Sequence, residues 1–167
     1  MRTHISFSEM KIWSECPYKH KLIYKDNVKQ FLGNEYTAFG TAIHHVCELA
    51  VVDDKVVMIQ ELKLLTEKNV DLKKKLISDM RLQAKNLVNF ILPALKKTFK
   101  KFEVVSVEEE LMIPIENSTM MFKGFIDLVI KTPDQKYHVI DWKTCSWGWD
   151  SKKKTDRIIN YQITLYK

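Results

Sequence analysis

The stretch that decides the fold runs from Met120 to Lys143 and reads MMFKGFIDLVIKTPDQKYHVIDWK. Two segments rich in β-branched and aromatic residues, Met120–Ile130 and Tyr137–Lys143, predict two strands. Between them, residues 132–136 (Thr-Pro-Asp-Gln-Lys) have the chemistry of a turn. We therefore expect a β-hairpin.

The hairpin brings two carboxylates together. If residues 132–136 form the turn, Lys131 pairs with Tyr137, and counting back places Asp127 opposite Asp141. Opposed carboxylates repel each other, and both follow an isoleucine in a run that reads as buried. Two nearby buried carboxylates need a cation, or one of them must take up a proton. A hard divalent ion such as Mg²⁺ is the simplest remedy, because it prefers carboxylate oxygen ligands.

Lys143 follows Asp141 by two residues, so both side chains project from the same face of the predicted strand. An ammonium beside a metal-bound carboxylate pair can orient or help deprotonate an attacking water. It can also offset charge on a phosphorane-like transition state. An isolated Asp-x-Lys tripeptide is usually a surface ion pair, and the chemical interpretation depends on Asp127 across the ladder.

The first part of the chain reads as helical. Ser6 and Glu9 form a capping box that starts a short helix, and Pro17 separates it from a second helix ending near Tyr24. Residues 25–36 read as a loop, and helical spacing of apolar residues predicts further helices over 37–52, 55–68 and 71–100.

After Phe102 the pattern becomes mixed. Strands are predicted over 104–107 and 111–115, ahead of the hairpin, and a closing helix over 156–167. We therefore predict an α/β fold with a small central mixed β-sheet flanked by helices and a helical N-terminal half.

Bulk properties limit the classes of function. A chain of 167 residues with 46% hydrophobic and 29% charged residues predicts one soluble domain over 1–167. No apolar run reaches membrane-spanning length and the N-terminus lacks a signal-peptide core, which predicts a cytoplasmic protein without a membrane partner. The net charge of +6 suits a polyanionic partner such as DNA. Solvated lysine-rich helix faces, such as Lys96-Lys97, explain part of that charge equally well.

An aromatic and basic group follows the second hairpin strand. It consists of Trp142, Trp147, Trp149, Lys152, Lys153, Lys154 and Arg157. Core packing is the usual role of tryptophan, but aromatic side chains beside a basic run can also stack on and grip a nucleic-acid strand. Both interpretations stay open.

Several of these stretches together resemble the PD-(D/E)XK nuclease superfamily, specifically its RecB-type branch. Gly124–Asp127 and Val139–Thr144 are similar to the superfamily core. Other stretches are similar to further motifs of the branch: Gly40–Glu48 to G-x-x-x-H-x-x-x-E, Gln162–Tyr166 to Q-x-x-x-Y, and Ser6–Tyr18 to the N-terminal S-x-S…C-P segment. The resemblance covers nearly the whole chain and implies a restriction-endonuclease-like core, with 1–167 as a single nuclease domain.

The resemblance also implies roles for individual residues. The implied metal ligands are His44, Asp127, Asp141 and the backbone carbonyl of Trp142, and the implied ion is Mg²⁺ or Mn²⁺. Lys143 would be the catalytic lysine, with Gln162 and Tyr166 beside the site.

Around this implied site, Glu48 lies one helical turn after His44 on the same helix face, whereas His45 is expected to be structural. Glu108 is the nearest counterpart of the branch's strand glutamate, although Glu109 or neither residue fits as well within an acidic triplet.

Departures from the branch carry further expectations. Some members hold an iron–sulfur cluster with one N-terminal and three C-terminal cysteines. Here only Cys16 occupies such a place, because Cys145 precedes the Q-x-x-x-Y motif, so no cluster is expected. The chain stops at Lys167 directly after that motif, which predicts a minimal or truncated domain. No helicase motif is present, so unwinding would need a partner such as a helicase or recombination protein.

The function expected from the sequence is metal-dependent hydrolysis of DNA phosphodiester bonds, as an exonuclease in recombination, repair or phage DNA metabolism. The alternative is a catalytically silent DNA-binding module that keeps the nuclease fold. The sequence leaves open exo- or endonuclease mode, polarity, strand preference and oligomeric state.

Overall fold

The structure is a computed structural model that describes residues 3–28, 35–52, 74–144, 148 and 150–166. Its elements in chain order are β1 (His4–Ser6), α1 (Phe7–Glu15), α2 (Pro17–His20), a π-helix (Lys21–Lys25), α3 (Glu35–Val52), α5 (Lys74–Phe99), β2 (Glu103–Pro114), β3 (Met121–Lys131), β4 (Tyr137–Ile140), α6 (Ser151–Lys154) and α7 (Arg157–Leu165). The helix predicted over 55–68 lies outside the described residues, as do Cys145, Trp147 and Trp149.

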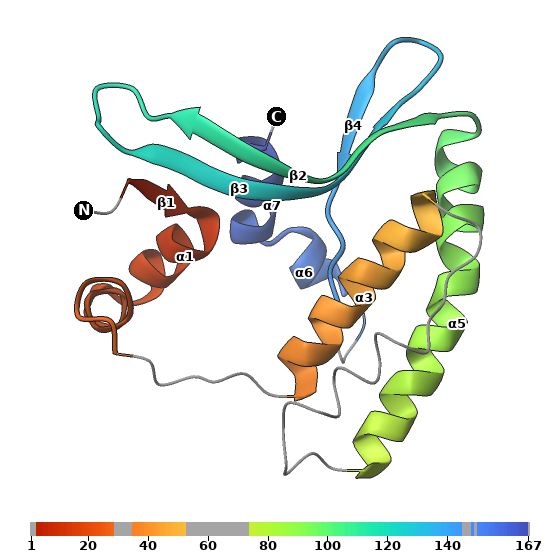
Figure 1. The fold of residues 1–167 in the computed structure, drawn as a ribbon, viewed down its shortest axis with the longest axis horizontal. Coiled ribbons are helices and arrows are strands. Elements are labelled where there is room, and N and C mark those ends of the chain that lie inside the picture. Colours follow the sequence, from red (N-terminus) through yellow and green to blue (C-terminus); the bar gives the residue numbers. More distant parts are fainter. Residues whose placement is uncertain (1–2, 29–34, 53–73, 145–147, 149, 167) are drawn as a thin grey trace. The chain divides into compact units, whose positions relative to one another are not determined.

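The strands form one four-stranded mixed sheet (Figure 1). The order along its main path is β1-β3-β2, and β4 also pairs with β3. β1 runs parallel to β3, whereas β4 runs antiparallel to it. The prediction of an α/β fold with a small mixed sheet and flanking helices is confirmed.

The hairpin has the predicted register. Lys131 pairs with Tyr137, and the ladder continues without interruption to Leu128 opposite Ile140. Within the turn, the Thr132 N–H donates to the Lys136 carbonyl at 2.9 Å. The paired residues end there, and Asp127 and Asp141 are the next residues on the two sides of the hairpin. That they stand directly opposite each other stays a prediction.

The elements differ from the sequence prediction in several places. β4 ends at Ile140 rather than Lys143, because the N–H of Trp142 donates to the Asp127 carboxylate and leaves the ladder. β2 is one continuous strand, Glu103–Pro114, where two separate segments are predicted. The parallel strand β1 and the short helix α6 are not predicted from the sequence; three or four residues are too short for a periodic pattern.

Contacts divide the chain into two compact units. Unit 1 comprises Met1–Leu32, Glu108–Ile126 and Trp147–Lys167, and unit 2 comprises Gly33–Val107 and Asp127–Ser146. That residues 1–167 form a single nuclease domain stays a prediction.

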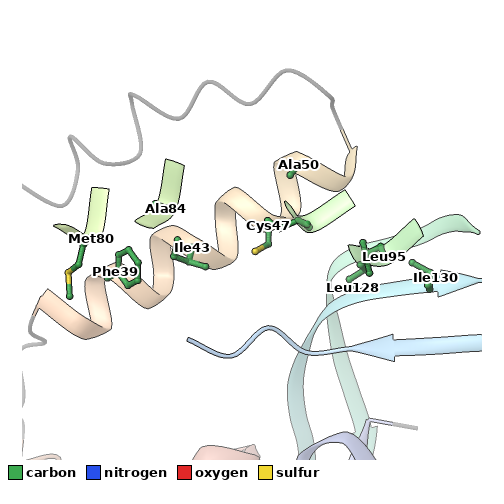
Figure 2. Packing of buried hydrophobic residues seen from close by; sticks show 10 residues of the cluster. Phe39, Ile43, Cys47, Ala50, Met80, Ala84, Leu95, Leu128 and Ile130 are labelled. Carbon is green, nitrogen blue, oxygen red and sulfur yellow. The ribbon is translucent and has the colours of Figure 1, made fainter. Parts of the chain in front are cut away.

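Unit 2 is built on the packing of α3 against α5 (Figure 2). One face of α3 presents Phe39, Ile43 and Cys47 to Met80 and Ala84 of α5. Ile43 and Cys47 follow Phe39 by four and eight residues, which is the spacing of one helix face. Five further residues complete the same core: Ala50 of α3, Ile91 and Leu95 of α5, and Leu128 and Ile130 of β3.

The first helix of unit 1, α1, is capped at its N-terminus. The Ser6 hydroxyl accepts from the Glu9 N–H at 3.3 Å, as the predicted capping box requires of this serine. The Glu9 carboxylate is 4% exposed, and its Oε1 lies 2.8 Å from Nε2 of His20. This pair ties α1 to α2, and nothing in the sequence pattern predicts it.

Among the described residues, no helix has both the length and the apolar character needed to cross a bilayer.

Candidate metal and catalytic site

Asp127 is a buried carboxylate in unit 2 with two polar neighbours. It lies within β3, four residues before the strand ends, and is 6% exposed. Its Oδ2 accepts a hydrogen bond from the Trp142 N–H at 2.5 Å. Its Oδ1 lies 3.4 Å from Nδ1 of His44. The carboxylate is therefore held between the segment that follows β4 and helix α3.

Asp141 lies directly after β4, and its side chain is 6% exposed. The Nζ of Lys143 lies 2.5 Å from its Oδ2, so the predicted neighbours form a close ion pair. Burial raises the pKa of Asp141, the Lys143 ammonium opposes that shift, and the Asp127 charge adds to it. The two acidic groups thus occupy an environment that disfavours two bare negative charges.

His44 comes from the middle of α3, and its side chain is 28% exposed. Its contact with Asp127 raises the pKa of the imidazole, while burial lowers it. An imidazole that binds a metal must be neutral, so an ion would have to displace this proton.

One turn before His44, Gly40 lies against Thr144. A Cβ atom built on Gly40 would be 3.4 Å from the Thr144 hydroxyl oxygen. Helix α3 thereby passes close to the segment that carries Lys143.

Glu48 pairs with His45 rather than extending the line from His44. Nδ1 of His45 lies 3.2 Å from the Glu48 carboxylate, and the His45 side chain is 42% exposed. His45 therefore pairs on the helix surface with the residue three positions later, which agrees with a structural role.

The donor set of unit 2 fits a divalent cation. Asp127 and Asp141 offer buried carboxylate oxygens, which hard cations prefer, and His44 offers an imidazole nitrogen beside Asp127. A bound cation would also remove the unfavourable effect of burial on the charge of Asp141. That the Trp142 carbonyl is a metal ligand stays a prediction.

The hydrogen bond from the Trp142 backbone N–H to the Asp127 carboxylate is a contact that sequence reasoning missed. The predicted register could have revealed this contact, since Trp142 directly follows Asp141 and its N–H can reach the Asp127 carboxylate. The Trp142 side chain packs against the core of unit 2, and its indole N–H is buried without an acceptor among the described residues. This packing supports the core interpretation for that tryptophan.

Gln162 and Tyr166 lie in unit 1. Gln162 Nε2 donates to the Tyr166 hydroxyl at 3.3 Å, and Tyr166 is 9% exposed. Its ring packs against Phe122 of β3, with the ring centroids 6.4 Å apart. Their predicted role beside the acidic residues stays a prediction.

The basic residues of the aromatic and basic group also belong to unit 1. Lys152 and Lys154 are exposed on α6, and Arg157 is exposed at the start of α7. Lys153 belongs to α6, and its side chain lies outside the described part. Exposure leaves these cations available to a polyanion, which keeps the DNA-contact interpretation open.

Glu108 sits inside β2 with φ 50°, in the left-handed region. A non-glycine residue in that region is uncommon within a strand and is typical of a bulge. Whether Glu108 or Glu109 assists the site stays open.

Two comparisons relate the sequence to known proteins. The sequence model of the PD-(D/E)XK nuclease superfamily matches residues 4–167. No curated protein matches the sequence.

Proposed function

Because the chain belongs to the PD-(D/E)XK nuclease superfamily, we propose that it hydrolyses DNA phosphodiester bonds with the help of Mg²⁺ or Mn²⁺. We further place it in the RecB-type branch, as an exonuclease of recombination, repair or phage DNA metabolism. The Ser6–Tyr18 and Gln162–Tyr166 motifs support that branch.

One observation carries the proposal. Two nearly buried carboxylates, Asp127 on β3 and Asp141 directly after β4, are close enough for the Asp127 charge to act on Asp141, and Lys143 contacts Asp141 at 2.5 Å. Structural ion pairs have no need of a second buried carboxylate beside the first, because its repulsion costs stability. A metal-dependent phosphodiesterase has a use for it, because paired carboxylates bind the cation that activates the attacking water, and a nearby ammonium can offset charge on the phosphate.

The residues that would hold the ion are His44, Asp127 and Asp141, together with the carbonyl of Trp142. When bound, a divalent ion supplies charge that polarises the scissile phosphate and lowers the pKa of an attacking water. The Trp142 N–H keeps the Asp127 carboxylate in one orientation through its hydrogen bond to Oδ2. Fixing that carboxylate before DNA arrives reduces the reorganisation needed at the moment of reaction.

Lys143 is assigned as the catalytic lysine. Asp141 holds its ammonium close to the acidic pair, and the lysine side chain is 33% exposed, so solvent and substrate can reach it. Its charge either orients and helps deprotonate the attacking water or offsets charge that develops on the phosphorus oxygens. Orienting the water and offsetting charge require the protonated ammonium, whereas taking a proton from the water requires the neutral amine.

The remaining assignments concern DNA. Gln162 and Tyr166 are proposed to support the site or contact the strand. The exposed cations Lys152, Lys154 and Arg157 are proposed to contact phosphates. Unwinding of duplex DNA would fall to a helicase or recombination partner.

The deciding experiment compares end-labelled linear DNA with closed circular DNA, each single- and double-stranded. Purified protein is incubated with Mg²⁺, with Mn²⁺ and with EDTA, and the products are resolved by length. Metal-dependent loss of linear DNA only indicates an exonuclease, and cutting of circles indicates an endonuclease. DNA binding with no metal-dependent cleavage of any form would overturn the proposal in favour of the silent DNA-binding module.

A further inference from the structure

The C-terminal end of α5 carries a concentration of positive charge. Lys96, Lys97, Lys100 and Lys101 are all exposed. Within the described part of the chain, none of these four lysines lies within ion-pair distance of a carboxylate. Other lysines do have such partners: Lys11, Lys21, Lys123, Lys136 and Lys143. The positive charge of these four lysines is therefore not neutralised by carboxylates of the described residues.

The helix dipole accounts for only part of this cluster. Lys96 and Lys97 lie in the last turn, where cations offset the partial negative charge of the helix end. Lys100 and Lys101 follow the final helical residue, Phe99. Lys100 has φ 60°, and its N–H donates to the Lys96 carbonyl at 2.9 Å.

This geometry is the helix-ending position that glycine occupies most often, because glycine has no Cβ atom to clash. A lysine in this backbone conformation makes the fold less stable than a glycine would. A function for its charge would explain why lysine is found here, since strained residues gather at functional positions.

A pocket of about 260 Å³ adjoins this end of the helix. It lies between the start of β2 and the β3–β4 turn, entirely within unit 2, and its lining includes Lys101, Phe102, Glu103, Lys131 and Gln135. The Nζ of Lys131 also lies 5.4 Å from the ring centroid of Tyr137, which is 62% exposed. Lysines with an accessible aromatic ring are the side chains that nucleic-acid strands contact.

The same two strands lead from this pocket to the acidic pair. Lys131 follows Asp127 by four residues on β3, a separation of about 13 Å along a strand. Four residues also return a strand to the same face. One strand of DNA advances ~3.4 Å per nucleotide along the helix axis, so the separation corresponds to roughly four nucleotides.

We propose that the pocket lined by Lys101 and Lys131, together with the adjoining Lys100 and the Tyr137 ring beside Lys131 (the lysine pocket), binds the phosphodiester backbone of DNA a few nucleotides from the bond that is cut. The inference rests on the proposed function, because it takes DNA as the substrate. It adds a binding surface made of residues outside the superfamily motifs.

The test measures binding separately from cleavage. A fluorescein-labelled duplex is titrated with protein in EDTA at several salt concentrations, and anisotropy gives the affinity. Lys101→Gln should weaken binding by roughly fivefold and lower the salt slope by ~0.9, as expected for the loss of one phosphate contact. Lys85→Gln is the matched control. It removes the same charge, and Lys85 is exposed on the same helix about 22 Å before Lys100.

Two more variants give opposite signs. Lys100→Gly should raise the melting temperature by roughly 2–4 °C through relief of strain, and yet weaken DNA binding. Glu103→Gln removes a negative charge from the pocket lining and should tighten binding. A structural role alone predicts no change in DNA affinity for either variant.

Equal affinities and slopes for Lys101→Gln, Lys85→Gln and wild type would overturn the lysine pocket while leaving metal-dependent cleavage standing. If the protein shows the predicted binding pattern but cleaves no DNA, the result supports the lysine pocket and contradicts the proposed nuclease function.

Discussion

The ring of Tyr166 packs so closely on Gly124 that a Cβ atom built there would lie 2.6 Å from Cε1 of the ring. Gly124 does not have a positive φ, so its backbone conformation does not require glycine. The requirement comes from the approach of the ring. Gly124 lies on β3 three residues before Asp127, and Tyr166 accepts a hydrogen bond from Gln162. The contact thus fixes α7 on the strand that leads to the acidic pair.

Replacing Gly124 with alanine should destabilise the protein by about 1–3 kcal/mol, because the added methyl group overpacks the contact with Tyr166. In a Tyr166→Leu background the same replacement should cost much less, since the ring is gone. Urea unfolding of the four proteins of this cycle measures the coupling. Equal costs in both backgrounds would remove the ring as the cause.

Gly40→Ala is the matched control for Gly124→Ala. A Cβ atom at Gly40 would make an ordinary contact, 3.4 Å from the Thr144 hydroxyl. Gly40 lies inside α3, where alanine stabilises a helix by about 0.5–1 kcal/mol relative to glycine. We expect the two alanine variants to shift stability in opposite directions. A large loss at Gly40 would mean that α3 and the Thr144 segment cannot separate by even a few tenths of an ångström.

Asp141→Asn should abolish cleavage and remove a pH-dependent strain from the metal-free protein. Burial raises the pKa of Asp141 in the folded state, so the folded protein binds its proton more tightly than the unfolded chain does. Its charged form therefore destabilises the fold at pH values above the raised pKa, and the effect fades as the pH falls toward 3.8.

Metal-free Asp141→Asn protein should thus equal or exceed wild type in stability near neutral pH. That advantage should vanish in acid. Chemical denaturation of both proteins across the acidic range, in EDTA, measures it. An advantage that grew on acidification would contradict the assigned burial effect.

Lys143→Ala should separate chemistry from binding. Metal-dependent stabilisation and DNA affinity should persist, while turnover falls by roughly 10²–10⁴-fold because a transition-state interaction is lost. Lys136→Ala is the control, since Lys136 also forms an ion pair with an aspartate, at 2.7 Å, but is an exposed residue of the hairpin turn. Single-turnover kinetics compare the two. Equal activity of both variants would assign Lys143 to a surface ion pair.

His44→Ala should weaken Mn²⁺ binding, whereas His45→Ala should leave it near the wild-type value. His44 contacts Asp127, but His45 forms a half-exposed pair with Glu48. Because the pKa of His44 is raised, the ion must compete with a proton, so the wild-type affinity should rise with pH through the raised value. Calorimetry at several pH values checks both points, and an exchange of the two phenotypes would place the ligand on the wrong histidine.

The cysteines should differ in reactivity. Burial raises the pKa of Cys47 to about 12, and Cys47 is only 4% exposed in the core of unit 2. Cys16 is exposed at the start of α2. Native protein treated with iodoacetamide at about pH 8 should be modified at Cys16 and not at Cys47, because only the thiolate reacts. Peptide mapping by mass spectrometry reads out both sites, with urea-unfolded protein as the positive control.

Local chemistry determined much of this protein from sequence alone. The turn residues 132–136 set the hairpin register from Lys131–Tyr137 to Leu128–Ile140, and the same count predicts Asp127 opposite Asp141. The Ser6 cap fixed the start of α1, and helical spacing located α3 to within two residues at its start. These features depend on neighbours in the chain or on a counted pairing, so the residue order contains them.

Only the tertiary structure decided the contacts between distant segments. The parallel pairing of β1 with β3, the pairing of Glu9 with His20, and the seat of the Tyr166 ring on Gly124 join residues that no period or turn relates. The tertiary structure also decided that β4 ends at Ile140, because the Trp142 N–H donates to the Asp127 carboxylate instead of continuing the ladder. Each depends on where whole elements pack, and packing is set by the summed burial of many side chains, which no local pattern encodes.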